Sequence, residues 1–188
     1  MDLLQQHGQA MEEFDRRVRA VPEDRWHDPT PCEEWNVRDL VNHLVSEQLW
    51  APHLLAGETL EDVGDRYEGD VLGDDPVATW ERTSRQAREA FLRPGALNGT
   101  VHTSMGELPA SEYTQQMTID LAIHGWDLAR AVGAEERLDR QLVQELFEVW
   151  EPRQELLASS GVFAPPVDVP EDADVQVRLL AVLGRDGR

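Results

Sequence analysis

Two side chains that can bind metal lie four residues apart in one segment of this chain: Asp120 and His124. The segment 111–132 contains no proline and many strong helix formers, so we predict a helix there. Residues four apart lie one above the other on the same helix face, where a carboxylate and an imidazole can bind one cation. A third ligand must come from elsewhere, and His43, inside another predicted helix, is the best candidate.

Two histidine nitrogens and one carboxylate are ligands that suit zinc, iron, nickel or cobalt. The alternative is that Asp120 pairs with an arginine or caps a helix, while the two histidines are core residues with ordinary hydrogen bonds. All three side chains are costly to bury separately, and one cation would satisfy them together. We therefore predict a divalent metal, zinc in the first place, held by His43, Asp120 and His124.

Three neighbours of these residues also need an interpretation. Glu47 lies one turn after His43 and is the candidate catalytic residue, as a general base or an added ligand, although it could instead pair with an arginine. Asp127 lies one turn after His124 and is either an acceptor that orients the imidazole or a surface carboxylate. We interpret Cys32 as a small buried hydrophobic residue.

Helices that position these side chains are predicted from apolar residues at helical spacing. The expected ranges are 2–20, 37–55, 76–92, 111–132, 139–159 and 173–183. Asn36 followed by Asp39 matches a capping box, Pro76 suits a first helical turn, and Gly133 suits a helix C-cap.

The stretches between these helices are predicted to be an exposed loop over 56–75, a small β hairpin over 100–108 and an extended tail over 161–170. Amphipathic helices of this length need a shared interior. We therefore predict an all-α fold, an antiparallel four-helix bundle with up-and-down or crossover connections and C-terminal helical additions. Residues 1–160 are expected to form the metal-binding bundle, and residues 161–188 an extension packed on it.

The charge balance and the rare residues exclude several classes of function. The 188 residues include 37 acidic and 17 basic ones, a net charge of -20, which disfavours nucleic acid and anionic membranes as partners. The chain has no lysine, which excludes Schiff-base catalysis, and its single cysteine excludes an internal disulfide. Neither a signal peptide nor a membrane-spanning apolar run is visible, so we expect a cytoplasmic protein. A homodimer is compatible with the sequence.

Two motifs give the chain a family resemblance. They are Thr30-Pro31-Cys32-x-x-Trp35-x-Val37-Arg38-Asp39-Leu40-x-x-His43-Leu44 and Asp120-x-x-x-His124-Gly125-Trp126-Asp127-Leu128-Ala129. The chain resembles actinobacterial metal-binding proteins related to the N-terminal domain of mycothiol-dependent maleylpyruvate isomerase, within the DinB-like four-helix bundles. The resemblance implies that His43, Asp120 and His124 ligate a divalent metal, with Asp120 where the isomerase has a glutamate. It also implies a low-molecular-weight thiol, mycothiol, as cosubstrate.

The function predicted from these features is a metal-dependent S-transferase or isomerase in which a thiol attacks a small electrophile. One alternative is hydrolysis by a metal-activated water, with Glu47 as the base. Another is a non-catalytic binding or regulatory module that keeps the metal. The isomerase continues into a further C-terminal domain, and we expect this chain to be too short to contain one, which favours the non-catalytic module.

Overall fold

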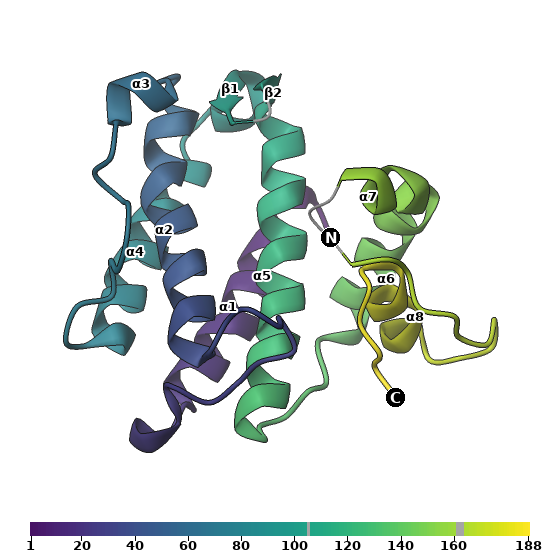
Figure 1. Cartoon of the computed structure of the whole chain (residues 1–188). Helices are drawn as coiled ribbons and strands as arrows, with labels where there is room; N and C mark the ends of the chain where they lie inside the picture. The colour runs from purple at the N-terminus through teal and green to yellow at the C-terminus, as the bar shows by residue number, and fades with distance from the viewer. Residues whose placement is uncertain (105, 161–163) are drawn as a thin grey trace. The chain divides into compact units, whose positions relative to one another are not determined.

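The computed structural model describes residues 1–104, 106–160 and 164–188, and the chain forms two compact units (Figure 1). One unit comprises residues 2–135; the other comprises residues 136–188 together with Met1. Among the described residues, no helix has both the length and the apolar character needed to cross a bilayer.

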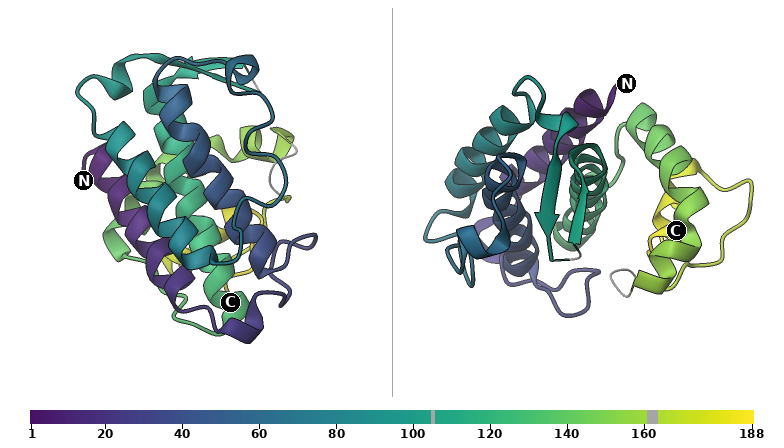
Figure 2. Two further views of the ribbon diagram at one scale, coloured as in Figure 1. Left: turned by 90° about the vertical axis from the view of Figure 1, so that its left-hand side faces the viewer. Right: turned by 90° about the horizontal axis from the view of Figure 1, so that it is seen from above.

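The first unit is a four-helix bundle, as predicted. Its helices are α1 (Leu3–Arg19), α2 (Val37–Leu55), α4 (Pro76–Phe91) and α5 (Ala110–Val132). Helices α1 and α2 each pack against both α4 and α5, so the four surround one core (Figure 2). Fully buried apolar side chains from all four helices fill it, among them Phe14, Leu44, Trp80 and Leu128.

Side-chain pairs between the helices establish their directions. Arg19 at the end of α1 pairs with Glu81 near the start of α4, so these neighbours run antiparallel. Arg38 at the start of α2 donates to Asp70 and to the carbonyl of Gly73, just before α4 begins. Helices α2 and α4 therefore run in the same direction, and residues 56–75 form a crossover along the bundle (Figure 1).

The crossover is held to α2 by a row of polar side chains instead of being a free loop. His53 lies 2.8 Å from the Tyr67 hydroxyl, and Ser46 donates to the Tyr67 carbonyl. The Asn42 amide donates to the carbonyl of Gly69 and accepts from the backbone of Val71. The crossover also contains a short helix, α3 (Leu60–Val63). It therefore forms a defined wall beside α2.

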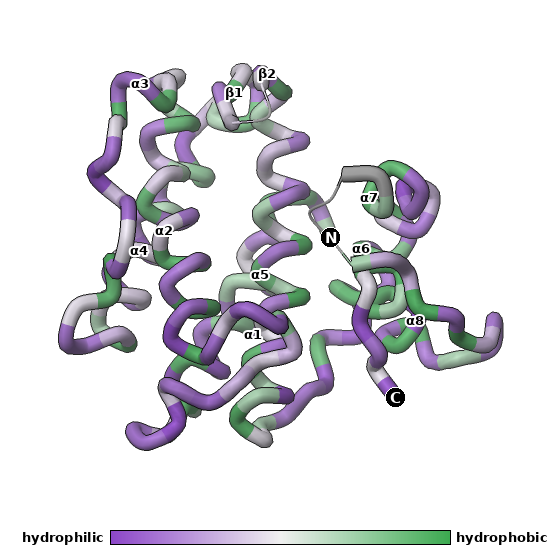
Figure 3. The backbone as a smooth tube through the Cα atoms, in the orientation of Figure 1, coloured by the Kyte–Doolittle hydropathy of each residue, from purple (hydrophilic) through white to green (hydrophobic). Residues whose placement is uncertain are grey.

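The helix-capping residues predicted from the sequence are found at the ends of the bundle helices. Asn36 and Asp39 form a reciprocal capping box on α2. Pro76 occupies the first turn of α4, and Gly133 ends α5 in the left-handed conformation. Along these helices hydrophilic and hydrophobic residues alternate in the manner of amphipathic helices (Figure 3).

The predicted hairpin is also present and packs on one end of the bundle. Strands β1 (Thr100–Thr103) and β2 (Gly106–Pro109) pair antiparallel, with Val101 opposite Leu108. Met105, between them, lies outside the described residues. Val101 is fully buried in a cluster with residues of α2, α4 and α5, and Figure 2 shows the hairpin beside the ends of α2 and α5 from above.

In its described residues, the second unit contains three further α-helices. These are α6 (Arg140–Trp150), α7 (Gln154–Ser160) and α8 (Val175–Val182), with a 3-10 turn at Glu151–Arg153 after α6. The prediction of a single helix over 139–159 is wrong. Pro152 lacks the N–H that would continue the α-helical hydrogen bonds, and the helix is interrupted there. Of the extended tail expected over 161–170, residues 161–163 lie outside the described part of the chain.

The compact units divide the chain after residue 135, not after residue 160 as expected. Helix α6 packs against α8. The buried Gln176 of α8 also accepts from the backbone of Leu138 and donates to the carbonyl of Glu136. Leu142 and Leu146, on the apolar stripe of α6, are almost fully buried.

Candidate metal centre

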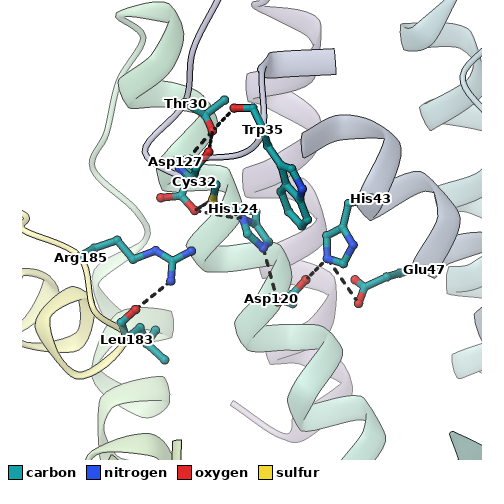
Figure 4. Close-up of polar contacts among 10 residues, drawn as sticks. All are labelled: Thr30, Cys32, Trp35, His43, Glu47, Asp120, His124, Asp127, Leu183 and Arg185. Atoms are coloured by element: carbon teal, nitrogen blue, oxygen red, sulfur yellow. Dashed lines mark hydrogen bonds and ion pairs between the residues drawn. The ribbon is translucent and has the colours of Figure 1, made fainter. Parts of the chain in front are cut away.

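The three predicted ligands come together where α2 packs against α5. Figure 4 shows Asp120 between the two imidazoles. Its Oδ2 lies 3.1 Å from Nε2 of His43, and its Oδ1 lies 3.6 Å from Nε2 of His124. The three potential ligand atoms all lie within 4.8 Å of one another. Four-coordinate zinc holds its ligands at about 2.0–2.2 Å, so the donors fit a single cation after a small contraction.

The site is largely enclosed. The side chains of His43, Asp120 and His124 are 32%, 19% and 8% exposed, respectively. Burial alone would lower the pKa of His43, but hydrogen bonding to Asp120 and the charge of Glu47 raise it overall. Burial opposes ionisation of Asp120, yet the two histidines hold its pKa well below its ordinary range. Asp120 is therefore a carboxylate, the form that can bind metal.

Glu47 extends the site by one turn of α2. Its Oε1 lies 3.7 Å from Nε2 of His43, on the side facing Asp120 (Figure 4). Its Oε2 is buried and has no hydrogen-bond partner among the described residues. Burial and the charge of Asp120 raise the pKa of the Glu47 carboxyl well above its ordinary value. A second carboxyl group with spare bonding capacity therefore stands beside the three ligands.

Asp127 contacts the far side of the His124 ring. Its Oδ2 lies 3.0 Å from Nδ1 of His124, and Asp127 is fully buried. A carboxylate at Nδ1 favours a proton there and leaves the Nε2 lone pair free for a metal. Of the two interpretations drawn from the sequence, the orienting acceptor is therefore the one that fits the structure.

Cys32 belongs to the same group of contacts, which the sequence did not indicate. Its Sγ lies 3.3 Å from Oδ2 of Asp127 and 3.8 Å from Nδ1 of His124. The Thr30 hydroxyl fixes this loop, accepting from the backbone of Cys32 and donating to the carbonyl of Trp35. The interpretation of Cys32 as a small hydrophobic filler is incomplete, because its thiol reaches a polar pair. Only the folded loop brings it there.

Trp35 covers both imidazoles. Its ring centroid lies 4.7 Å from that of His43 and 5.6 Å from that of His124. Nearby on α5, the guanidinium of Arg130 lies 4.7 Å from the Trp126 ring centroid. His102 of β1 pairs with Glu107 across the hairpin.

A cavity of about 540 Å³ adjoins the site on the side of His43 and Glu47. Its walls come from α2, α5, the crossover and the hairpin. The lining residues are His43, Ser46, Glu47, Trp50, Leu54, Leu60, Gly64, Glu68, Thr103, Ser104, Tyr113, Gln116 and Met117. This volume is sufficient for a small organic molecule.

A helical bundle with two histidines and a carboxylate from facing helices defines a class of candidate metalloproteins. The model of the mycothiol maleylpyruvate isomerase N-terminal domain family matches residues 7–129, and the chain belongs to that family. Two uncharacterized proteins, from two strains of Mycobacterium tuberculosis, are each 32% identical to it over 149 residues, which is 77% of this chain and 75% of theirs.

Solved structures with the same fold include a mycothiol-dependent maleylpyruvate isomerase. It aligns with a TM-score of 0.70 at 16% identity, covering 98% of this chain and 88% of its own. A histidine-to-alanine mutant of such an isomerase aligns with a TM-score of 0.63, also at 16% identity, covering 84% and 71%. In these two alignments 12% and 29% of the isomerase chains have no counterpart in this chain, and the expectation that a further C-terminal domain is missing stays a prediction.

Proposed function

We propose that this chain binds one divalent cation, zinc in the first place, through His43, Asp120 and His124. We further propose that it uses a low-molecular-weight thiol of the mycothiol type to attack a small electrophile. The observation that carries the proposal is the convergence of three donor groups from α2 and α5 beside a cavity of ligand size. The similar solved structures are of mycothiol-dependent isomerases, which supports the choice of thiol.

In this proposal some residues of the chain support metal binding, and another accepts a proton. Asp127 keeps the His124 ring in the tautomer and orientation that metal binding requires. Trp35 shields both imidazoles from water. A divalent cation in this site would lower the pKa of a thiol or water that reaches it.

Glu47 is the proposed proton acceptor. It stands within 3.7 Å of His43, so a thiol entering from the cavity beside His43 would come within reach of its carboxyl group. A carboxyl group with a raised pKa is a better base near neutral pH than an ordinary glutamate, and burial together with Asp120 raises this one. The same group would serve a water molecule, so hydrolysis is the second candidate reaction.

Cobalt substitution tests the proposal directly. Adding mycothiol or a simpler thiol to the cobalt-loaded protein should produce a sulfur-to-metal charge-transfer band. The experiment is best performed in the Cys32→Ala background, because the protein's own thiol lies 3.8 Å from His124. The band should vanish in the additional His124→Ala variant.

The possible outcomes separate the candidate functions. Full cobalt content with no band and no consumption of electrophiles would favour the non-catalytic metal-binding module. Ester or amide cleavage without any thiol would favour hydrolysis. Thiol-dependent consumption of an electrophile, reduced at least about tenfold by Glu47→Gln, is the result expected for the proposed chemistry.

A further inference from the structure

The wall of the cavity beside the metal centre contains a hydroxyl group with spare hydrogen-bonding capacity, that of Tyr113. This residue lines the cavity and is only 6% exposed. Its hydroxyl makes no hydrogen bond to the residues that the structure describes, yet the oxygen is not sealed from solvent. The hydroxyl therefore opens onto the cavity.

Two other hydroxyls of the cavity wall are already engaged. Ser46 donates to the carbonyl of Tyr67. Thr103 donates to the carbonyl of Gly106. These two groups hold the crossover and the hairpin in place, whereas the Tyr113 hydroxyl has no such structural contact.

Packing explains the ring of Tyr113 but not its hydroxyl. The ring stacks on Phe91 of α4, with centroids 6.1 Å apart and planes inclined by 20°, inside a cluster of buried apolar residues. A phenylalanine would fill this place equally well. Burial raises the pKa of the Tyr113 phenol above its ordinary value, so the group keeps its proton and can donate it in a hydrogen bond. A molecule in the cavity would supply the missing acceptor.

Tyr113 lies on the same face of α5 as the proposed ligand Asp120. Seven residues separate them, close to two helical turns, which places them about 10 Å apart along the helix axis. His43 and Glu47 line the same cavity beside the ligands. A small molecule attacked by a thiol at the metal centre would therefore extend along α5 towards Tyr113.

We infer that Tyr113 binds the electrophile, donating a hydrogen bond from Oη to an uncharged oxygen at the end remote from the reacting carbon. The inference rests on the proposed thiol chemistry and specifies its substrate class: small electrophiles with a carbonyl or similar acceptor oxygen about one benzene ring away from the carbon attacked. The proposed cation binds the thiol at the opposite end of the cavity. An oxygen in this remote position cannot reach the cation while the reacting carbon lies at the sulfur.

A matched pair of electrophiles tests the inference: 4-acetylbenzyl bromide and 4-isopropenylbenzyl bromide, which have similar shapes but differ in the acceptor oxygen. In both, the thiol sulfur bonds to the benzylic carbon, bromide leaves with the bonding electrons, and the thiol proton passes through Glu47 to solvent. Each kcat/KM is divided by the rate constant of the uncatalysed reaction with mycothiol. The zinc-loaded protein should prefer the acetyl compound at least about fivefold.

Removal of one hydroxyl locates the effect. Tyr113→Phe should abolish the preference for the acetyl compound and leave the isopropenyl compound almost unaffected. The matched control is Tyr67→Phe, which removes the hydroxyl of the only other tyrosine in the chain, a group that contacts His53 and does not line the cavity. The control should keep the wild-type preference. An equal loss with both electrophiles in Tyr113→Phe, or an unchanged preference, would overturn the inference.

Two further readouts need no turnover. Calorimetry should show the acetyl thioether product binding wild type at least about fivefold more tightly than it binds Tyr113→Phe, with no such difference for the isopropenyl thioether. The urea midpoint of Tyr113→Phe should equal that of wild type, because the hydroxyl has no partner within the described chain. If neither electrophile reacts but the difference in binding holds, the thiol chemistry fails while the role of Tyr113 stands. If the affinities do not differ, the role of Tyr113 is refuted whether or not the thiol reacts.

Discussion

Asp127 Oδ2 lies 3.0 Å from Nδ1 of His124, so the imidazole has a fixed partner on the side away from Asp120. The ring therefore presents Nε2 to the other proposed ligands without needing the metal to orient it. This arrangement has the form of a metal-binding histidine supported by a carboxylate.

The ligand assignment predicts the metal content of two variants. His43→Ala and His124→Ala should each lose most of the bound metal, because two remaining donors bind a divalent cation weakly. Circular dichroism should show the bundle intact, since its core is apolar and separate from the site. His53→Ala, which removes a histidine of α2 that contacts Tyr67, should retain its metal in elemental analysis. Unchanged stoichiometry in both ligand variants would refute the assignment.

Asp127→Asn tests the orienting contact. Loss of the carboxylate at Nδ1 should weaken metal binding by about 10- to 100-fold while the three ligands remain in place. Competition with a chelator measures the affinity. Cys32→Ala, which removes another neighbour of Asp127, is the matched control and should change the affinity less than about threefold. Equal affinities of Asp127→Asn and wild type would show that the contact does not support the ligand.

Asn42→Ala should detach the middle of the crossover from α2. The substitution removes both hydrogen bonds that the amide makes to Gly69 and Val71. We expect a loss of about 1–3 kcal/mol in the free energy of unfolding, measured with urea, and faster proteolysis within the crossover. The control is Gln86→Ala, at an exposed position of α4. It should leave both the free energy of unfolding and the rate of proteolysis unchanged. A crossover that resists protease as well in Asn42→Ala as in wild type would contradict this role.

His7 should make stability depend on pH. It is fully buried, and burial together with the charge of Arg88 lowers its pKa to about 3. Below its ordinary pKa of about 6.5 the unfolded chain protonates this side chain and the folded chain does not. Stability is therefore present above pH 6.5 and is lost progressively as the pH falls towards 3.

The measurement compares unfolding free energies at pH 6.5 and 5.5 in wild type and His7→Gln. Wild type should lose about 1 kcal/mol more over this unit, because only it carries the titrating ring, which is already half protonated in the unfolded chain at pH 6.5. Taking the difference between the two proteins cancels the contributions of other titrating groups. Parallel pH profiles would show that burial of His7 contributes no such dependence.

Local signals in the sequence predicted the parts of this fold that depend on few residues. The capping box of Asn36 and Asp39 and the C-cap at Gly133 are decided by neighbours along the chain, and both are present. The i, i+4 spacing of Asp120 and His124 likewise predicted that both side chains lie on one helix face. The choice of His43 as their partner rested on the cost of burying the three side chains separately and on the family resemblance, because periodicity does not determine which helix faces which.

Contacts between distant polar side chains could not be predicted in this way. The position of Cys32 beside Asp127 depends on how the loop before α2 folds back on α5. The anchoring of the crossover depends on partners such as Ser46 and Tyr67, 21 residues apart. No local pattern specifies such pairs, and the segment was therefore predicted only as an exposed loop.

The crossover wall has a consequence for how this family could diverge. Leu60, Gly64 and Glu68 line the cavity, yet the proposed ligands all come from α2 and α5. Mutations in the crossover can therefore alter which molecules are admitted while leaving the bundle core and the ligand geometry unchanged. Paralogues with the same bundle could acquire new specificities by sequence drift in this one segment, without passing through intermediates that have lost the metal centre.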